Sequence, residues 1–495
     1  MLLFLTMFSL YGLTSSWYFQ SDIRFAFETT YRLVEDHALT IPAGSTTNDC
    51  RITIGKDHQW YSQYEPGMSI VLIPFFLIGK FIYLVTGIDA RMPISTLILI
   101  ICGAGLITLI YFDLKKRRYS ETICLVTALS YGLFSMIWWY TKPYTRDIVI
   151  TFLFFSSYYL AESYLKTKQL RSLLLVSLLL TGLIWIKSSA ALAFFGYLFL
   201  MFGSKNSFRT SEIKRILYFI LPFAMGVGLL ILYNYILFGN FLTGGYDNQL
   251  EGAGNLLNAV YGMIISPGNG ILIHNPILIP ALIGLYRYSP KKYLIFAALI
   301  FFPFFLYLGT RWFWNSVPFW GPRYIMYIIP FTAIGLADYL KHLGQKLQNR
   351  RLFVVILIIS AILHIPAVLM SNGTYQYYLL DHYTLPDYTY TPSLSYGYLN
   401  GQILIAGINR QDSVTIKAPE NYFVHRFLPD GKEIYDFTSR DYKKKFKLEW
   451  DAIAINCWSG YSLSYQLLTI TLVVLLFGSI IGLIRTLKQS GTITT

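Results

Sequence analysis

Long apolar blocks dominate the chain, and short polar stretches separate them. Most blocks hold about 15 to 22 residues, close to the roughly 20 residues that a helix needs to cross the hydrocarbon core of a bilayer. Solid apolar runs of this length predict transmembrane helices, whereas the strands of an outer-membrane barrel alternate apolar and polar positions. The blocks cover residues 2–19, 67–87, 93–112, 120–140, 148–164, 172–186, 189–203, 216–237, 275–286, 293–309, 324–340, 352–370 and 463–484.

Some of the polar stretches are rich in Lys and Arg, and the positive-inside rule places them in the cytoplasm. These basic stretches are 115–118, 166–171, 205–215, 287–292, 341–351 and 485–488. If every block crossed the membrane from a cytoplasmic N-terminus, the stretch 115–118 would fall outside. We therefore predict that the block 67–87, which follows Pro66 and contains Lys80, lies along the outer membrane surface without crossing. With the N-terminus outside instead, residues 20–65 would be cytoplasmic.

The pattern thus predicts an all-α polytopic membrane protein with about twelve transmembrane helices. Juxtamembrane helices would lie on its outer face, and a small β-containing extracytoplasmic domain would follow near the C-terminus. Residues 1–370 would form the transmembrane domain, with long outer loops at 20–92 and 238–274. Residues 462–495 would hold the last transmembrane helix and a cytoplasmic tail.

The predicted tail domain covers residues 371–461. It is rich in Tyr at first and then alternates apolar and polar positions at 412–418 and 445–455, which is typical of strands. Because this domain and the other long polar segments all lie on the predicted outer side, we expect any chemistry to take place there.

The composition agrees with a membrane protein, because 55% of the residues are hydrophobic and only 13% are charged. The formal net charge of +14 could also indicate a nucleic-acid-binding protein. However, the basic stretches hold half of the 40 Lys and Arg residues, and only Asp113, Glu121 and Glu212 lie in or next to them. The remaining sequence is close to neutral. The basic excess therefore reflects membrane topology, and we expect no nucleic-acid partner.

The chain has four cysteines, too few for a disulfide framework. Cys102 and Cys124 lie in apolar blocks and are interpreted as small core residues. Cys50 and Cys457 both fall on the predicted outer side, where a disulfide would survive, but the sequence leaves their pairing open. Residues 1–19 have no basic start and no small-residue cleavage site, so we expect a retained helix and not a signal peptide.

Two acidic residues stand where outer loops meet predicted helices. Asp22 lies near the start of an outer loop, SDIRFAFETTYRLVEDHALTIP, whose apolar positions fit an amphipathic helix, and Asp147 follows Arg146 at the start of another helix. Either carboxylate could simply cap its helix. A pair of carboxylates at the depth of the membrane interface, both near cations, would also suit a general base that faces an anionic membrane-anchored substrate.

Cationic side chains recur at the same predicted depth. They are Lys187 in WIKSSA, Arg311 in GTRWFWN and Arg323 in FWGPRY. Lone cations at helix ends commonly extend toward water, but a guanidinium that follows Gly321-Pro322 also suits bidentate recognition of a phosphate. The aromatic residues around Arg323 would form either an interfacial belt or a surface on which a sugar stacks.

Motifs of soluble nucleotide chemistry are absent from the sequence. It contains no GxxxxGK[ST], no strand followed by GxGxxG, and no HExxH or CxxC pair. An activated substrate would therefore reach this protein within the membrane.

The order of these motifs resembles the bacterial members of the GT-C glycosyltransferase superfamily, which includes protein O-mannosyltransferases and the lipid A aminoarabinose transferase. The likeness covers about residues 1 to 345, starting with Asp22 in the first outer loop. The matching segments that follow are YSQYEPGMS, Arg146-Asp147, Lys187 in a helix break, SPGNGILIHNP and WGPRY. Two departures, Ile23 after a lone Asp22 and Glu65 before Pro66, distinguish the chain from the protein mannosyltransferases.

The resemblance implies a sugar donor linked to a polyprenyl phosphate and a hydroxyl acceptor on an envelope glycan, lipid or protein. It further implies a multi-pass protein of the bacterial inner membrane, with its active site on the extracytoplasmic face. Asp22 and Asp147 match the catalytic carboxylates of the family. The other residues assigned by this resemblance are Arg323, Lys187, Arg146 and Arg311 for the donor phosphate, and Tyr61, Tyr64, Tyr324, His274 and Trp320 for the substrate lining.

Direct displacement at the anomeric carbon with inversion would then have Asp22 as the base. Asp22 and Asp147 could share a divalent metal, although cations could replace it, so no cofactor is assigned. Two alternatives remain open at this point. An O-antigen ligase or polymerase would use a lipid diphosphate donor, and a lipid or glycan transporter would carry ionisable residues near the bilayer midplane.

Overall fold

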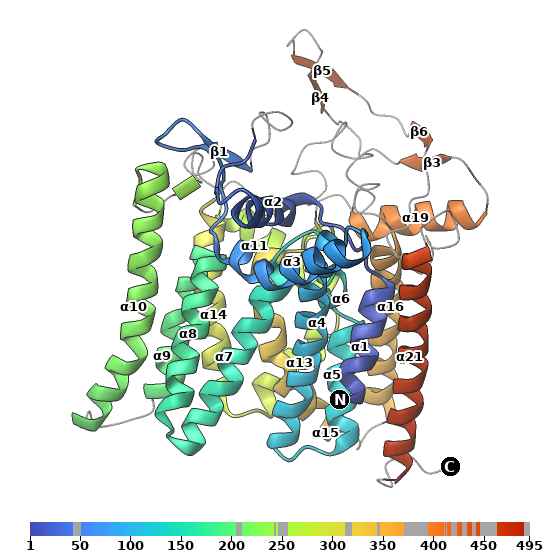
Figure 1. The fold of residues 1–495 in the computed structure, drawn as a ribbon. Coiled ribbons are helices and arrows are strands. Elements are labelled where there is room, and N and C mark those ends of the chain that lie inside the picture. The colour runs from blue at the N-terminus through green and yellow to red at the C-terminus, as the bar shows by residue number, and fades with distance from the viewer. Residues whose placement is uncertain are drawn as a thin grey trace.

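A computed structural model gives the fold (Figure 1). The structure describes residues 1–42, 51–203, 210–241, 244–245, 256–311, 319–343, 347–370, 395–409, 411, 413–416, 423–427, 433–437, 442–445 and 463–489.

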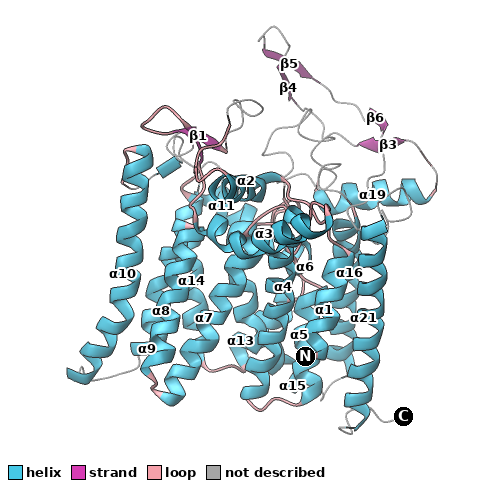
Figure 2. Ribbon diagram, viewed as in Figure 1, coloured by secondary structure: helices cyan, strands magenta, loops and turns pink. Residues whose placement is uncertain are grey.

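The long helices run side by side as a bundle (Figures 1 and 2). They are α1 (Leu2–Leu13), α4 (Arg91–Lys116), α5 (Glu121–Leu133), α7 (Asp147–Thr167), α8 (Leu170–Ile186), α9 (Phe194–Phe202), α10 (Thr210–Phe238), α13 (Leu278–Arg287), α14 (Lys291–Gly309), α15 (Ala333–Leu343), α16 (Leu347–Leu369) and α21 (Leu463–Gln489). A single cluster of buried apolar side chains joins α1, α4, α5, α7, α8, α14 and α15. Helix α10 stands at one edge of the bundle, where it packs against α8.

Other helices lie across one end of the bundle, here called the α2/α3 end (Figure 1). They are α2 (Ser21–Glu35), α3 (Gly67–Thr86) and α19 (Tyr396–Ile408). The strands β1 (Ile52–Ile54) and β2 (Trp60–Ser62) form an antiparallel hairpin beyond them, with Ile52 opposite Ser62. Short helical segments complete the described chain: α6 (Ile137–Tyr140), η1 (Ser188–Ala193), α11 (Leu256–Ile265), α12 (Ile271–His274) and η3 (Arg323–Thr332).

The described helices have the length and surface of membrane-spanning segments. Seven of them are long and apolar enough to cross a bilayer: α3, α4, α7, α10, α14, α16 and α21. Large apolar side chains such as Met225 and Val474 are exposed on the outside of the bundle, as lipid contact requires. The chain is therefore a multi-pass membrane protein.

Although α3 qualifies as a span by length and composition, it lies across the bundle (Figure 1). Glu35 at the end of α2 holds it there, because the Glu35 carboxylate accepts a hydrogen bond from Lys80 Nζ at 2.7 Å and pairs with Arg91 at 3.4 Å. The position of α3 across the bundle is consistent with the prediction, made from the basic stretches, that residues 67–87 do not cross the membrane. The turns that carry the stretches 115–118 and 166–171 lie at the end of the bundle opposite α2 and α3.

Some predicted blocks are broken in the structure. The block 120–140 becomes α5 and α6, and the block 324–340 starts as the 3₁₀ segment η3. In η3, Pro330 has no N–H to donate to an α-helical hydrogen bond, so the α-helix proper begins only at Ala333. Cys102 and Cys124 are buried core residues, as predicted. Cys50 and Cys457 lie outside the described residues.

Within the predicted tail domain, residues 396–408 form the helix α19, which was not predicted. Further along, β3 (Ser413–Ile416) pairs antiparallel with β6 (Tyr442–Lys445), and β4 (Phe423–Phe427) pairs with β5 (Glu433–Phe437). The strand predicted at 412–418 thus corresponds to β3. The strand predicted at 445–455 lies, after Lys445, outside the described residues.

Candidate active site at the α2/α3 end

The linker between α1 and α2 brings Asp22 against the turn that precedes α7. The backbone N–H of Gln20 donates to the carbonyl of Pro143 at 2.9 Å, and the N–H of Ile23 donates to that of Tyr144 at 3.5 Å. Ser21 adopts a left-handed φ of 50°, which redirects the chain immediately before Asp22. The capping interpretation of Asp22 is wrong, because the N-cap of α2 is Gln20 and no side chain caps the helix.

The carboxylate of Asp22 instead pairs with Arg323. Arg323 Nη1 donates to Asp22 Oδ2 at 2.5 Å, and Arg323 Nη2 donates to the Tyr324 hydroxyl at 2.9 Å. The ring of Phe319 covers one face of the guanidinium at 4.1 Å, and Arg323 Nε is buried without a hydrogen-bond partner. Arg323 is therefore only 9% exposed and does not extend to water.

A glycine turn positions this guanidinium. Gly321 has a φ of +66°, which an L side chain rarely adopts, and a Cβ at this position would lie 3.0 Å from His274 Cγ. Pro322 follows, and η3 begins at Arg323. The turn predicted from Gly321-Pro322 thus sets the direction in which Arg323 leaves the chain.

Asp22 is strongly ionised despite its burial. Burial opposes the charged form, but the positive charges of Arg323 and Arg51 and the hydrogen bonds from Arg323 and Tyr64 outweigh that cost and lower the pKa of Asp22. Arg51 also donates to Ser21 Oγ at 3.1 Å and lies 3.9 Å from Asp22 Oδ1. The sequence analysis did not single out Arg51.

A second acidic centre lies beside the first. Asp147 Oδ1 accepts a hydrogen bond from the Tyr327 hydroxyl at 2.7 Å and lies 3.6 Å from Lys187 Nζ. Lys187 donates to the same hydroxyl at 2.6 Å and packs over the Tyr324 ring at 4.3 Å. Burial lowers the pKa of Lys187 to about 8, although the Asp147 carboxylate partly opposes this shift. Asp147 is thus a partner of Lys187, and no side chain caps α7.

A third carboxylate, Glu65, completes the cluster. Glu65 Oε2 accepts from Arg146 Nη2 at 3.1 Å, and Glu65 Oε1 accepts from the backbone N–H of Ser188 at 2.8 Å. Arg146 stacks on the ring of Tyr64 at 4.6 Å. In the sequence, Glu65 stands out only as a difference from the protein mannosyltransferases. Its position between Tyr64 and the apolar α3 could have indicated a role in the site, because a buried carboxylate needs a partner.

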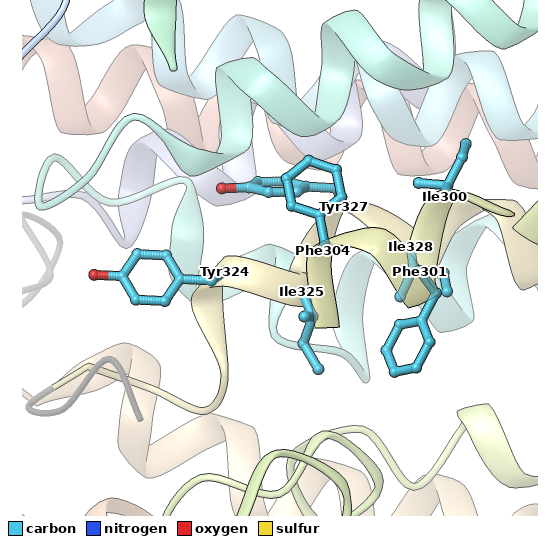
Figure 3. A pocket seen from close by; sticks show the side chains of 7 residues that line it. All are labelled: Ile300, Phe301, Phe304, Tyr324, Ile325, Tyr327 and Ile328. Atoms are coloured by element: carbon cyan, nitrogen blue, oxygen red, sulfur yellow. The ribbon is translucent and has the colours of Figure 1, made fainter. Parts of the chain in front are cut away.

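An open apolar cavity adjoins the cluster between α14 and η3 (Figure 3). The hydroxyl ends of Tyr324 and Tyr327 both point away from the apolar part of its lining. The other lining residues are Ile300, Phe301, Phe304, Ile325 and Ile328. The two tyrosines therefore separate an apolar space from the charged groups around Lys187.

Four other predicted site residues lie elsewhere in the structure. The Tyr61 hydroxyl donates to Asp57 within the hairpin region at 2.7 Å. His274 and Trp320 are 2% and 1% exposed, and their rings contact each other edge-on at 4.5 Å. These two side chains are packed inside the protein, beneath the turn that carries Arg323. Arg311 lies over the Tyr307 ring at 5.1 Å, and within the described ranges no ion pair joins it to the cluster.

The donor set does not fit a shared metal ion. Asp22 and Asp147 each have a cation as their partner, at 2.5 Å and 3.6 Å. Among the residues that the structure describes, no group of three or more His, Cys, Asp or Glu side chains could hold a metal. Chemically, the cluster offers an ionised carboxylate, two further acids and several cations beside an apolar cavity.

Comparisons with known proteins do not name a family for the chain. No family model matches the sequence, and neither does any curated protein. A structure of the oligosaccharyltransferase AglB from the archaeon Archaeoglobus fulgidus, with an inhibitory peptide and a dolichol-phosphate, aligns over 86% of this chain and 70% of that chain at 11% identity and a TM-score of 0.39. A structure of the oligosaccharyltransferase from the same organism, tethered to an acceptor peptide, covers the same shares at 10% identity and a TM-score of 0.38. Likeness at this level carries no argument about the fold or the function.

Proposed function

We propose that this protein is a membrane glycosyltransferase that moves a sugar from a polyprenyl-phosphate donor to a hydroxyl acceptor. The observation that carries the proposal is the Asp22–Arg323 pair beside Lys187 and Asp147, at the end of an apolar helical bundle. A carboxylate base and a set of cations for a phosphate leaving group are the two things that such a transfer requires. The resemblance of the sequence motifs to the GT-C superfamily points the same way.

Arg323 and Lys187 are the best-supported partners for the donor phosphate. Arg323 has an Nε–H without a hydrogen-bond partner on a side chain already aimed at the cluster. Guanidinium groups bind phosphate through two parallel hydrogen bonds, and Lys adds a point charge. The surface beside Tyr324 is lined mainly by apolar residues, so the lipid chain would lie against it.

In the proposed reaction Asp22 accepts the proton of the acceptor hydroxyl. The acceptor oxygen attacks the anomeric carbon as the bond from that carbon to the phosphate oxygen breaks, and the bonding electrons leave with the lipid phosphate. Attack opposite the leaving group inverts the anomeric configuration. While Asp22 is paired with Arg323, it is a weak base. A donor phosphate that binds Arg323 would weaken this pair and so raise the proton affinity of Asp22 once the donor is bound.

The proposal also includes a location. Because the turns that carry the basic stretches 115–118 and 166–171 lie at the other end of the bundle, the α2/α3 end would face away from the cytoplasm of a bacterial inner membrane. About twelve spans and a C-terminal extracytoplasmic domain with strands belong to the same proposal. The acceptor would be an envelope glycan, a lipid or a protein.

Transfer of labelled sugar by the purified protein tests this function. We expect turnover with a synthetic undecaprenyl monophosphate sugar, and a loss of roughly a hundredfold or more in Asp22→Asn, because a positioned base contributes about 10²–10⁴-fold. Normal turnover by Asp22→Asn would show that Asp22 is not the base. Turnover only with a lipid diphosphate donor would favour a ligase, and no transfer from either donor would contradict the proposal.

A further inference from the structure

Glu65 connects the segments that carry the candidate site, although it is not one of its predicted members. It lies between β2 and α3 and is 7% exposed. One of its oxygens binds Arg146, next to Asp147, and the other binds the N–H of Ser188, next to Lys187. A single carboxylate thus holds the two backbone segments that carry the second acidic centre.

The same contacts set the charge of the cluster. Arg323 is paired with Asp22, Lys187 with Asp147, and Arg146 with Glu65. Of these three carboxylates, Asp22 is the proposed base and Asp147 shares a tyrosine hydroxyl with Lys187. Glu65 binds a cation and a backbone amide and has no part in the proposed proton transfer. Its charge would therefore act on a bound phosphate electrostatically, at a distance and without a proton-transfer role.

We infer that Glu65 is a positioning residue whose negative charge limits how tightly the cation cluster holds the lipid phosphate, so that the phosphate product can leave. This inference rests on the proposed function. A site for a phosphate leaving group must stabilise the charge that develops in the transition state, but it must not retain the phosphate product. Partial neutralisation by a buried carboxylate, held at a fixed place, satisfies both demands.

Glu65→Gln tests the role of the charge. Glutamine keeps one carbonyl acceptor for the Ser188 N–H but adds one positive unit to the net charge of the cluster. A unit charge at about 8 Å and an effective dielectric constant of about 40 changes binding by about fivefold. We expect undecaprenyl phosphate to bind about fivefold more tightly to Glu65→Gln, and the KM for the donor to fall.

Glu35→Gln is the matched control. Glu35 is a half-buried carboxylate of the α2/α3 end that also has two cationic partners, Lys80 and Arg91. It lies 13 positions along α2 from Asp22, about 20 Å at 1.5 Å per residue. The same change of charge there should leave the affinity for undecaprenyl phosphate unchanged.

The sign of the effect separates this role from a purely structural one. If Glu65 only held the backbone together, Glu65→Gln would bind undecaprenyl phosphate more weakly and raise the KM. Weaker or unchanged binding by Glu65→Gln, with normal binding by the wild type, overturns the inference and leaves the proposed function intact. If the wild type binds no undecaprenyl phosphate and transfers no sugar, the proposed function and this inference both fail.

Discussion

Within the part of the chain that the structure describes, a cluster of buried ion pairs lies at each end of the bundle, and the two clusters differ in whether their hydrogen-bond donors are all used. At the end opposite α2 and α3, Arg117 donates to Asp113 at 2.8 Å, to the Tyr158 hydroxyl at 2.8 Å and to the hydroxyl of Tyr293. It also pairs with Glu162 at 3.4 Å. Every nitrogen of the Arg117 guanidinium therefore has a partner.

At the α2/α3 end the corresponding guanidinium has spare capacity. Arg323 Nε has no hydrogen-bond partner, and an apolar cavity adjoins the neighbouring Tyr324. Asp113 and Arg117 are one helical turn apart, whereas Asp22 and Arg323 are 301 positions apart. Burial and pairing alone therefore do not distinguish a site from a structural clamp. The unpartnered Nε–H of Arg323, next to an apolar cavity, does.

The strongest test of this difference replaces each arginine with methionine. Arg117→Met would remove the cation that pairs with Asp113 and would leave Glu162 with Lys292, although both carboxylates are nearly inaccessible. Removing one partner of a buried pair costs about 3–5 kcal/mol, so we expect most of the folded protein to be lost. Arg323→Met should keep the fold, because the Asp22 side chain is 15% exposed and can gain water, but transfer should fall by more than about a hundredfold.

Monodispersity in detergent after stepwise heating, together with the sugar-transfer assay, measures both outcomes. Arg117→Lys serves as the control, since it restores a charge but not the full set of hydrogen bonds, and it should recover part of the stability. If Arg323→Met unfolds as readily as Arg117→Met, both clusters stabilise the fold, and the proposed difference between them is wrong.

The sequence predicted the individual members of the site better than their arrangement. Asp22 and Asp147 stood out because a carboxylate at membrane depth is costly, and Arg323 because a glycine-proline break precedes it. Their pairing was not predictable, because nothing local relates the first outer loop to η3. Glu65 was overlooked for the same reason, since its partners Arg146 and Ser188 come from two other outer turns.

For the fold, too, local features were predicted better than the features that depend on packing. Apolar blocks predicted helices well, and the amphipathic pattern of residues 21–35 correctly predicted α2. Helix α19 was not predicted, because only the alternating stretches after it were interpreted, as strands. Tyr61, His274 and Trp320 were assigned to the substrate lining from the motif order, but packing decides exposure, and the last two are inside the protein.

The pH dependence of donor binding is expected to be a smaller effect. Burial lowers the pKa of Lys187 to about 8, so Lys187 is charged below that pH and loses its charge above it. The donor, a phosphodiester, keeps its single negative charge throughout this range. Donor affinity should therefore weaken by about tenfold between pH 7 and pH 9, because only the protonated lysine attracts the phosphate.

Titration of donor binding at several pH values in wild type and Lys187→Arg checks this expectation. Arginine stays charged over the whole range, so its curve should be flat. If Lys187→Arg shows the same weakening as the wild type, another group is responsible and Lys187 does not bind the phosphate.

The smallest effect concerns the turn that aims Arg323. Gly321 and Gly87 both have a left-handed φ, +66° and +73°, so alanine at either position should cost about 1 kcal/mol of stability. The surroundings of the two glycines differ. A Cβ at Gly321 meets His274, whereas nothing lies within 4 Å of a Cβ at Gly87.

Gly321→Ala should therefore raise the KM for the donor a few-fold by shifting Arg323, while Gly87→Ala should lose similar stability and keep its KM. Thermal unfolding in detergent and steady-state kinetics on the two variants make the comparison. Equal KM values for the two variants would mean that the turn at Gly321 does not determine the position of the Arg323 guanidinium. A rise in KM for Gly321→Ala alone would separate the strain of a left-handed residue, which both variants share, from the displacement of the guanidinium.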